Sequence, residues 1–124
     1  MRVGRNDETD VQNLIRINTS KIGINFRANV GKVKMLDGRW FDTGLPKGFS
    51  DLLGFRLSDG KIYFIEVKTE TGRVRPDQVQ FIKAMRLHGA IAGIARNVED
   101  ATELIETGTN AETELILWRP TNRR

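Results

Sequence analysis

The sequence predicts an α/β fold in which helices flank a mixed β-sheet. Two observations predict it: segments with helical apolar spacing alternate with short runs rich in β-branched and aromatic residues, and one pair of these runs is joined by a tight turn. The chain has 124 residues, 39% of them hydrophobic, which suffices for one modest core. We therefore expect residues 1–124 to form one domain, with 119–124 as a loose tail.

The first 50 residues predict a helix, extended segments and a long loop. Glu8–Ser20 carries apolar residues at helical spacing. Gly23–Val30 alternates apolar with polar side chains and predicts a strand. Lys32–Leu36 is a second extended run that leads into an Asp-Gly turn, a pattern consistent with a hairpin. Trp40–Ser50 contains glycine and proline without a regular period, so we expect a loop there.

The strongest strand signal lies in the middle of the chain. Asp51–Leu57 and Lys61–Thr69 are rich in Leu, Phe, Ile, Tyr and Val and flank the turn residues Asp59 and Gly60. We expect these two strands to pair at the centre of the sheet. After a charged connector, the sequence predicts a helix from Pro76 to Gly89, a strand at Ala90–Ala95, a helix at Val98–Glu106 and a strand at Glu114–Trp118.

Composition restricts the chemistry. The chain has no cysteine and one histidine, which excludes disulfides, thiolate zinc sites and histidine clusters, so any metal must be held by oxygen. Residues 1–97 carry 17 basic and 10 acidic side chains, whereas residues 98–124 carry 3 and 6. A basic excess of this kind suits a polyanionic partner such as nucleic acid. No apolar run is long enough for a membrane helix, and Met1–Asp10 is too polar for a signal peptide, so we expect a soluble intracellular protein with no membrane partner.

Two opposite charges lie on a strongly apolar strand. The strand period of two puts Glu66 and Lys68 on one face with Ile62 and Phe64. A carboxylate and an ammonium there cost free energy unless they are paired, hydrogen-bonded or bound to an ion. A purely structural ion pair is one explanation. The other depends on Asp51, which begins the preceding strand and lies near the same end of the sheet if the two strands pair around their turn.

Two carboxylates from adjacent strands, together with the Val67 carbonyl, form a hard oxygen site suited to Mg²⁺ or Mn²⁺. Such a metal site suits phosphodiester hydrolysis, with Lys68 orienting the attacking water or stabilising the negative charge of the transition state. Glu8, in the first turn of the first helix, is a candidate for a third carboxylate or for a ligand of a second metal. A solvated acid favoured by the helix dipole is the alternative explanation, and Asp7 and Asp10 compete for the same role.

Three blocks, Gly48–Asp51, Phe64–Thr69 and Arg73–Gln78, resemble the VRR-NUC family, a branch of the PD-(D/E)XK nucleases. The resemblance covers roughly residues 8–97 and implies a restriction-endonuclease-like PD-(D/E)XK core. It also implies that Asp51 and Glu66 are metal ligands.

The resemblance further implies that Lys68 is the catalytic lysine and places Gln78 beside the active site, although Gln78 is equally consistent with a helix surface residue. Glu8 fits the family's Glu-x-x-x-Gln pattern, which ends at Gln12. Ser50 departs from the family's proline, a position that does no chemistry.

The resemblance also implies an activity: a Mg²⁺- or Mn²⁺-dependent endodeoxyribonuclease. The chain is similar to the stand-alone phage type, which resembles Holliday junction resolvases and acts as a homodimer. This implies symmetric cutting of a four-way DNA junction. The expected location is the cytoplasm, in a phage or bacterial host cell. A sequence-specific or nicking enzyme of the same class is an alternative, and so is a non-enzymatic DNA-binding module. Six basic side chains are candidates for phosphate contacts: Lys32, Lys34, Arg73, Arg75, Lys83 and Arg86.

Overall fold

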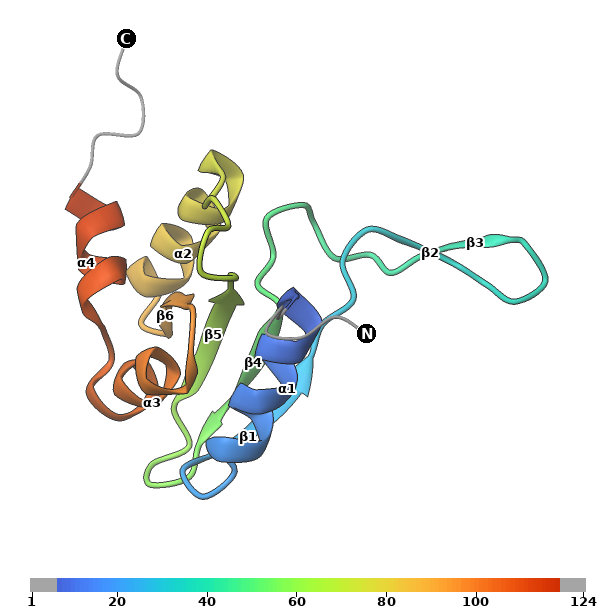
Figure 1. Cartoon of the computed structure of the whole chain (residues 1–124). Helices are drawn as coiled ribbons and strands as arrows, with labels where there is room; N and C mark the ends of the chain where they lie inside the picture. Colours follow the sequence, from blue (N-terminus) through green and yellow to red (C-terminus); the bar gives the residue numbers. More distant parts are fainter. Residues whose placement is uncertain (1–6, 119–124) are drawn as a thin grey trace, which may run out of the picture.

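The computed structural model describes residues 7–118 and consists of a four-stranded mixed sheet between two pairs of helices, with a separate two-stranded hairpin (Figure 1). The strand order is β1-β4-β5-β6; β1, β4 and β5 pair antiparallel, and β6 pairs parallel to β5. The expected mixed sheet flanked by helices is confirmed. The elements are α1 (Glu8–Asn18), β1 (Gly23–Arg27), β2 (Lys32–Lys34), β3 (Trp40–Asp42), β4 (Leu52–Arg56), β5 (Ile62–Val67), α2 (Pro76–Leu87), β6 (Ile91–Ala95), α3 (Val98–Thr107) and α4 (Ala111–Trp118).

The hairpin of β4 and β5 forms the centre of the sheet, as the sequence predicts. Leu52 lies opposite Ile65, and the turn contains Gly60 at a φ of 77°. Asp59 stabilises this turn, because its carboxylate accepts the backbone N–H of Lys61 at 3.1 Å and forms an ion pair with the preceding strand. In this register the first residues of β4 lie beside the last residues of β5.

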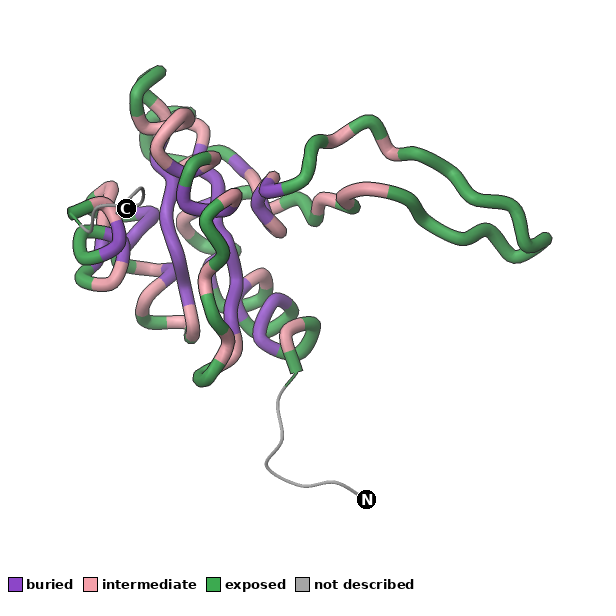
Figure 2. The backbone as a smooth tube through the Cα atoms, turned by 90° about the horizontal axis from the view of Figure 1, so that it is seen from above, coloured by how far each residue is buried: buried purple, intermediate pink, exposed green. Residues whose placement is uncertain are grey.

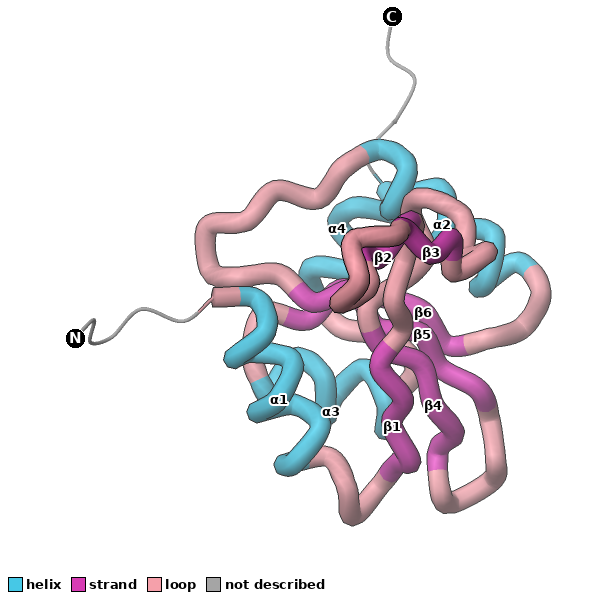
Figure 3. Tube along the Cα trace, turned by 90° about the vertical axis from the view of Figure 1, so that its right-hand side faces the viewer, coloured by secondary structure: helices cyan, strands magenta, loops and turns pink. Residues whose placement is uncertain are grey.

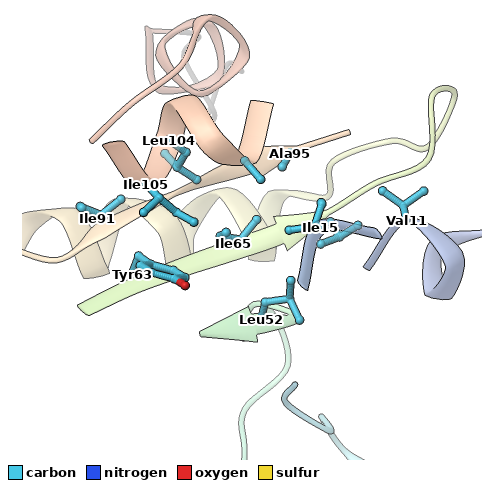
Figure 4. Packing of buried hydrophobic residues seen from close by; sticks show 11 residues of the cluster. Val11, Ile15, Leu52, Tyr63, Ile65, Ile91, Ala95, Leu104 and Ile105 are labelled. Carbon is cyan, nitrogen blue, oxygen red and sulfur yellow. The ribbon is translucent and has the colours of Figure 1, made fainter. Parts of the chain in front are cut away.

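Each face of the sheet is covered by one pair of helices. The alternation along β5 sends Tyr63, Ile65 and Val67 towards α1 and α3, which lie side by side (Figure 3), and sends Phe64 towards α2 and α4. Both clusters exclude water from large apolar side chains, which is the main stabilising contribution to the fold. The first cluster, shown in Figure 4, contains Val11, Ile15, Leu52, Tyr63, Ile65, Val67, Ile91, Ala95, Ala101, Leu104 and Ile105.

Two secondary-structure predictions are wrong. Glu114–Trp118 belongs to helix α4, because Asn110 caps the helix by accepting the backbone N–H of Thr113 at 2.9 Å and Ile116 then packs against the sheet. A short apolar run has no period that separates strand from helix. Trp40–Asp42, expected within a loop, is strand β3 and pairs with β2.

Residues 28–48, called the arm below, project away from the body of the protein (Figures 1 and 2). The two ends of the arm are fixed. At one end, the backbone N–H of Ala28 donates to the carbonyl of Asp51 at 2.8 Å. At the other, Gly48 has a φ of 94° and lies so close to Asp77 that a Cβ would be 2.7 Å from its carbonyl oxygen.

Within residues 7–118, no helix is long and apolar enough to span a membrane. The tail expected at 119–124 lies outside the described residues.

Candidate active site

Five polar side chains from four segments lie near the carboxyl end of β5. Glu66 and Lys68 come from β5 and the residue after it, Asp51 precedes β4, Gln78 lies in the first turn of α2, and Glu8 lies in the first turn of α1. The β4–β5 register places Asp51 beside the end of β5, and helices α1 and α2 both begin at this end of the sheet (Figure 1). The structure thus gathers the acids, the lysine and the glutamine that the sequence singled out.

Glu66 is the centre of this group and is only 2% exposed. The Gln78 side-chain amide donates to its Oε2 at 2.7 Å, and the Lys68 ammonium lies 3.9 Å from the same oxygen. Its other oxygen, Oε1, is buried and has no hydrogen-bond partner. A buried carboxyl oxygen without a donor costs free energy, so the position is prepared for a bound ion or proton.

Asp51 is joined to the same strand through the backbone. Its Oδ2 accepts the N–H of Val67 at 2.9 Å, one residue beyond Glu66. The segment before it is held by Phe49, whose ring packs edge-on against Phe64 at a centroid distance of 5.8 Å. A core contact therefore fixes the approach to Asp51.

Gln78 is buried rather than on the helix surface. It is 5% exposed, and its Oε1 accepts the backbone N–H of Arg75 at 2.9 Å. Pro76 at the first helical position fixes the backbone for this turn. Because Oε1 is engaged in this way, the amide nitrogen is directed at Glu66.

Three acids at the start of helix α1, Asp7, Glu8 and Asp10, have different environments. Asp7 is the N-cap, since its carboxylate accepts the N–H of Asp10 at 2.9 Å, and Asp10 is exposed. Glu8 is partly buried, and burial together with the charge of Asp51 raises the pKa of its carboxyl. Of the three acids at the start of this helix, Glu8 is therefore the candidate whose side chain lies towards Asp51 and Lys68.

The pKa of each carboxyl group at the centre of the site lies above its ordinary value. Burial, followed by the charge of Asp51, raises the pKa of Glu66 to about 9. Burial also raises the pKa of Asp51, against the opposing effect of its hydrogen bond from Val67. A divalent cation would reverse this balance by stabilising both carboxylates.

The donor set fits a hard cation. Glu66 supplies a buried, unpartnered oxygen, and Asp51 supplies a second carboxylate beside it. Among residues 7–118, however, no three Asp, Glu or His side chains gather closely enough to hold a metal by themselves. A metal site here would therefore need a backbone carbonyl, such as that of Val67, and water ligands in addition, the arrangement usual for Mg²⁺.

Sequence reasoning missed Arg96, the residue that follows β6. Its guanidinium donates to the carbonyls of Thr69 at 2.6 Å and Gly72 at 2.8 Å, and forms a bidentate pair with Glu112 at 2.8 Å for each contact. It thereby ties the loop between Lys68 and α2 to helix α4. Only the parallel pairing of β5 with β6 places Arg96 beside this loop, and the local sequence does not reveal that pairing.

Two further buried polar atoms have no hydrogen-bond partner among the described residues: Oε1 of Gln12 and Oγ of Ser50. Gln12 lies one helical turn after Glu8, and Ser50 directly precedes Asp51. The Glu-x-x-x-Gln spacing was the sequence signal for the first of these.

The predicted DNA-contacting residues are not all placed alike. Arg73 and Arg75 are exposed in the loop before α2, and Arg75 pairs with Asp77 at 3.1 Å. Lys32 and Lys34 are exposed on the arm, whereas Lys83 is half-buried on α2. Arg86 donates to the carbonyls of Ala92 at 3.0 Å and Gly108 at 3.1 Å, so it joins α2 to the neighbouring elements.

Comparison with known proteins agrees with the fold. The model of the VRR-NUC domain family matches residues 6–99. A solved structure of a VRR-NUC domain is similar at a TM-score of 0.56 and 25% sequence identity, covering 80% of this chain and 94% of that chain. A comparison with functionally characterised proteins found no match. On the family match over most of its length, the chain belongs to the VRR-NUC family of nucleases.

Proposed function

We propose that this chain is a metal-dependent DNA endonuclease. The observation that carries the proposal is the environment of Glu66: a buried carboxyl group, oriented by Gln78, with one unpartnered oxygen and with Asp51 and Lys68 beside it. A structural ion pair alone would leave Oε1 of Glu66 unexplained. Membership of a nuclease family supplies the reaction class.

In this proposal Asp51, Glu66 and the Val67 carbonyl hold Mg²⁺ or Mn²⁺, and Glu8 supplies a further carboxylate through a bridging water. When bound, the cation supplies positive charge for the phosphoryl oxygens and for activation of water. Gln78 keeps the Glu66 carboxyl group in place through its 2.7 Å hydrogen bond.

Lys68 acts on the reacting phosphate. Its side chain is 7% exposed, so its ammonium lies in a partly dehydrated environment. Positive charge in such an environment stabilises the negative charge of a phosphoryl transition state more strongly than it would in water. Lys68 therefore stabilises that charge or orients the attacking water.

We further propose branched DNA, such as a four-way junction, as the substrate, and a homodimer as the acting form. The resemblance to the stand-alone phage type supports both. Two symmetric nicks need two active sites related by a two-fold axis, which a dimer provides. The exposed Arg73 and Arg75 contact phosphates and position the duplex.

The test is cleavage of labelled four-way junction, flap, nicked duplex and linear duplex in Mg²⁺, Mn²⁺ or EDTA, with Glu66→Ala as the inactive control. Metal-dependent paired nicks in the junction alone are expected. A fixed recognition sequence in linear duplex would replace the junction proposal with a sequence-specific enzyme. DNA binding without cleavage of any substrate would leave a non-enzymatic module.

Lys68→Ala isolates the contribution of the lysine. We expect cleavage to fall on the order of 10²- to 10³-fold, as for loss of other groups that stabilise transition-state charge, while circular dichroism and DNA affinity stay unchanged. Lys61→Ala is the matched control, because Lys61 is exposed at the opposite end of β5. Equal cleavage by the two variants would remove Lys68 from the mechanism.

A further inference from the structure

The arm has two chemically different sides. Opposed residues in an antiparallel pair point to the same side, and successive residues alternate. Lys34 lies opposite Trp40 and Lys32 opposite Asp42, so both lysines share a side with the indole. Val33 lies opposite Phe41, which puts these two apolar residues on the other side.

The first side combines cations with an exposed aromatic ring. The Lys34 ammonium lies 5.9 Å from the centre of the Trp40 ring, and the tryptophan is 63% exposed. Leu36, next to the tip, is fully exposed. An isolated two-stranded hairpin is only marginally stable in water, and exposed apolar groups in such a segment indicate a binding surface.

The arm is attached at the candidate active site. Its first end is hydrogen-bonded to Asp51, and its second end packs against Asp77 at the start of α2, next to Gln78. Phe49, directly after the arm, is fixed between the rings of Phe64 and Phe81. A strand bound at Glu66 therefore passes the base of the arm, and the arm extends from there away from the body (Figure 2).

We propose that the arm binds unstacked bases of DNA that extends beyond the cutting site and so favours branched over continuous DNA. This deepens the proposed function and rests on it. Lys32 and Lys34 contact phosphates, and Trp40 stacks on a base that a junction leaves accessible. Lysines beside an exposed aromatic ring provide the phosphate contacts and the base stacking by which proteins bind single-stranded nucleic acid without regard to sequence.

The Trp40 side carries two lysines and one carboxylate, that of Asp42, and this net positive charge favours DNA over a protein partner. Arg27, the last residue of β1 and directly before the arm, is exposed and adds to the basic surface at the base of the arm. A polyanion complements this distribution, whereas a second copy of the same basic chain would bring like charges together.

The test is binding in EDTA, which does not depend on cleavage. Fluorescence titrations compare a four-way junction carrying 2-aminopurine at the branch with a linear duplex of the same sequence. Trp40→Ala is expected to weaken junction binding about tenfold, the size of one lost stacking contact, to leave duplex binding within about twofold, and to abolish the change in 2-aminopurine emission. Trp118→Ala is the matched control, since Trp118 is 82% exposed on α4.

The double variant Lys32→Ala/Lys34→Ala is expected to weaken binding of both DNAs and to reduce the slope of log affinity against log salt by about two. Unchanged junction affinity in both arm variants would overturn the proposal. So would a result in which Val33→Ser/Phe41→Ser turns a dimer into a monomer in sedimentation while Trp40→Ala binds normally, because the arm would then serve assembly. Trp40-dependent binding by a protein that cuts nothing would refute the nuclease proposal and leave the arm proposal standing.

Discussion

Strand β5 and the arm use similar residues in opposite ways. In β5, Tyr63, Phe64, Ile65 and Val67 are each at most 8% exposed. The arm carries Val33, Met35, Leu36, Trp40 and Phe41, and all of them are more than a third exposed. β5 has a strand on either side and helices over both faces, whereas β2 and β3 have only each other.

The difference teaches that the same composition serves stability in one place and binding in the other. Burial of β5 creates the dehydrated environment of Glu66 and Lys68, and a change in the volume of a side chain there disturbs the packing of the core. The arm contributes little to the core, so its apolar groups are available to a partner. Substitutions in the two regions should therefore separate stability from function.

A loss of stability larger than that of any substitution in the arm is expected from Gly54→Ala in β4. A Cβ at this position would overlap the carbonyl oxygen of Ile24 and lie 2.9 Å from the Tyr63 ring. We expect a loss of about 3 kcal/mol of unfolding free energy, at the upper end for overpacking, measured by urea denaturation.

Gly38→Ala in the arm is the comparison for this variant. Gly38 has a φ of 89° but no heavy atom within 4 Å of an added Cβ, so only local backbone strain of about 1–2 kcal/mol arises. Equal denaturation midpoints for the two variants would contradict the difference drawn between the body and the arm.

The second prediction concerns pH and the metal-free protein. The pKa of Glu66 is raised to about 9 by burial and by the Asp51 charge, from an ordinary value near 4.5. Below pH 4.5 this carboxyl group is protonated whether the chain is folded or not, so its contribution to stability is fully present. As pH rises towards 9, the unfolded chain releases the proton and the folded chain retains it, so stability falls.

Glu66→Gln tests this sign, because glutamine stays neutral in both states. In EDTA at pH 8 we expect the variant to be more stable than the wild type and less dependent on pH, and addition of Mg²⁺ should stabilise only the wild type. A wild-type protein in EDTA that gains stability between pH 5 and 9 would refute the raised pKa.

The third prediction concerns the loop between β5 and α2. Arg96→Lys removes the planar group that binds the Thr69 and Gly72 carbonyls together with Glu112. We expect a loss of about 2 kcal/mol, the range for hydrogen bonds to a charged group. Cleavage should fall about tenfold, since a shift of about 1 Å near a reacting centre costs 10²-fold or less.

Arg39→Lys is the control for the loss of stability, because among the described residues Arg39 forms an ion pair with the exposed Asp37 alone. A cleavage rate unchanged in Arg96→Lys, with the stability loss present, would confine Arg96 to a structural role.

The sequence predicted the centre of the molecule well and its periphery less well. The β4–β5 hairpin and the approach of Asp51 to Glu66 follow from local signals, namely the period of two and the turn at Asp59 and Gly60. Contacts between distant parts of the chain could not be predicted from local sequence. The helical state of Glu114–Trp118 depends on capping by Asn110 and on burial against the sheet. The bonds of Arg96 likewise require the parallel pairing of β6, which no local pattern specifies.

The smallest change in the free energy of unfolding is expected from Trp40→Ala. The side chain is 63% exposed and its neighbour across the hairpin is the ammonium-bearing Lys34, so its removal deprives the core of no contact. The unfolding free energy should change by less than about 0.5 kcal/mol, as for surface substitutions in general, although the same variant is expected to lose binding to branched DNA. A core residue behaves in the opposite way: Phe64→Ala should cost about 3–5 kcal/mol. If Trp40→Ala destabilised the chain as much as Phe64→Ala does, the arm would be packed against the body in solution, and its apolar side chains would not be available to a partner.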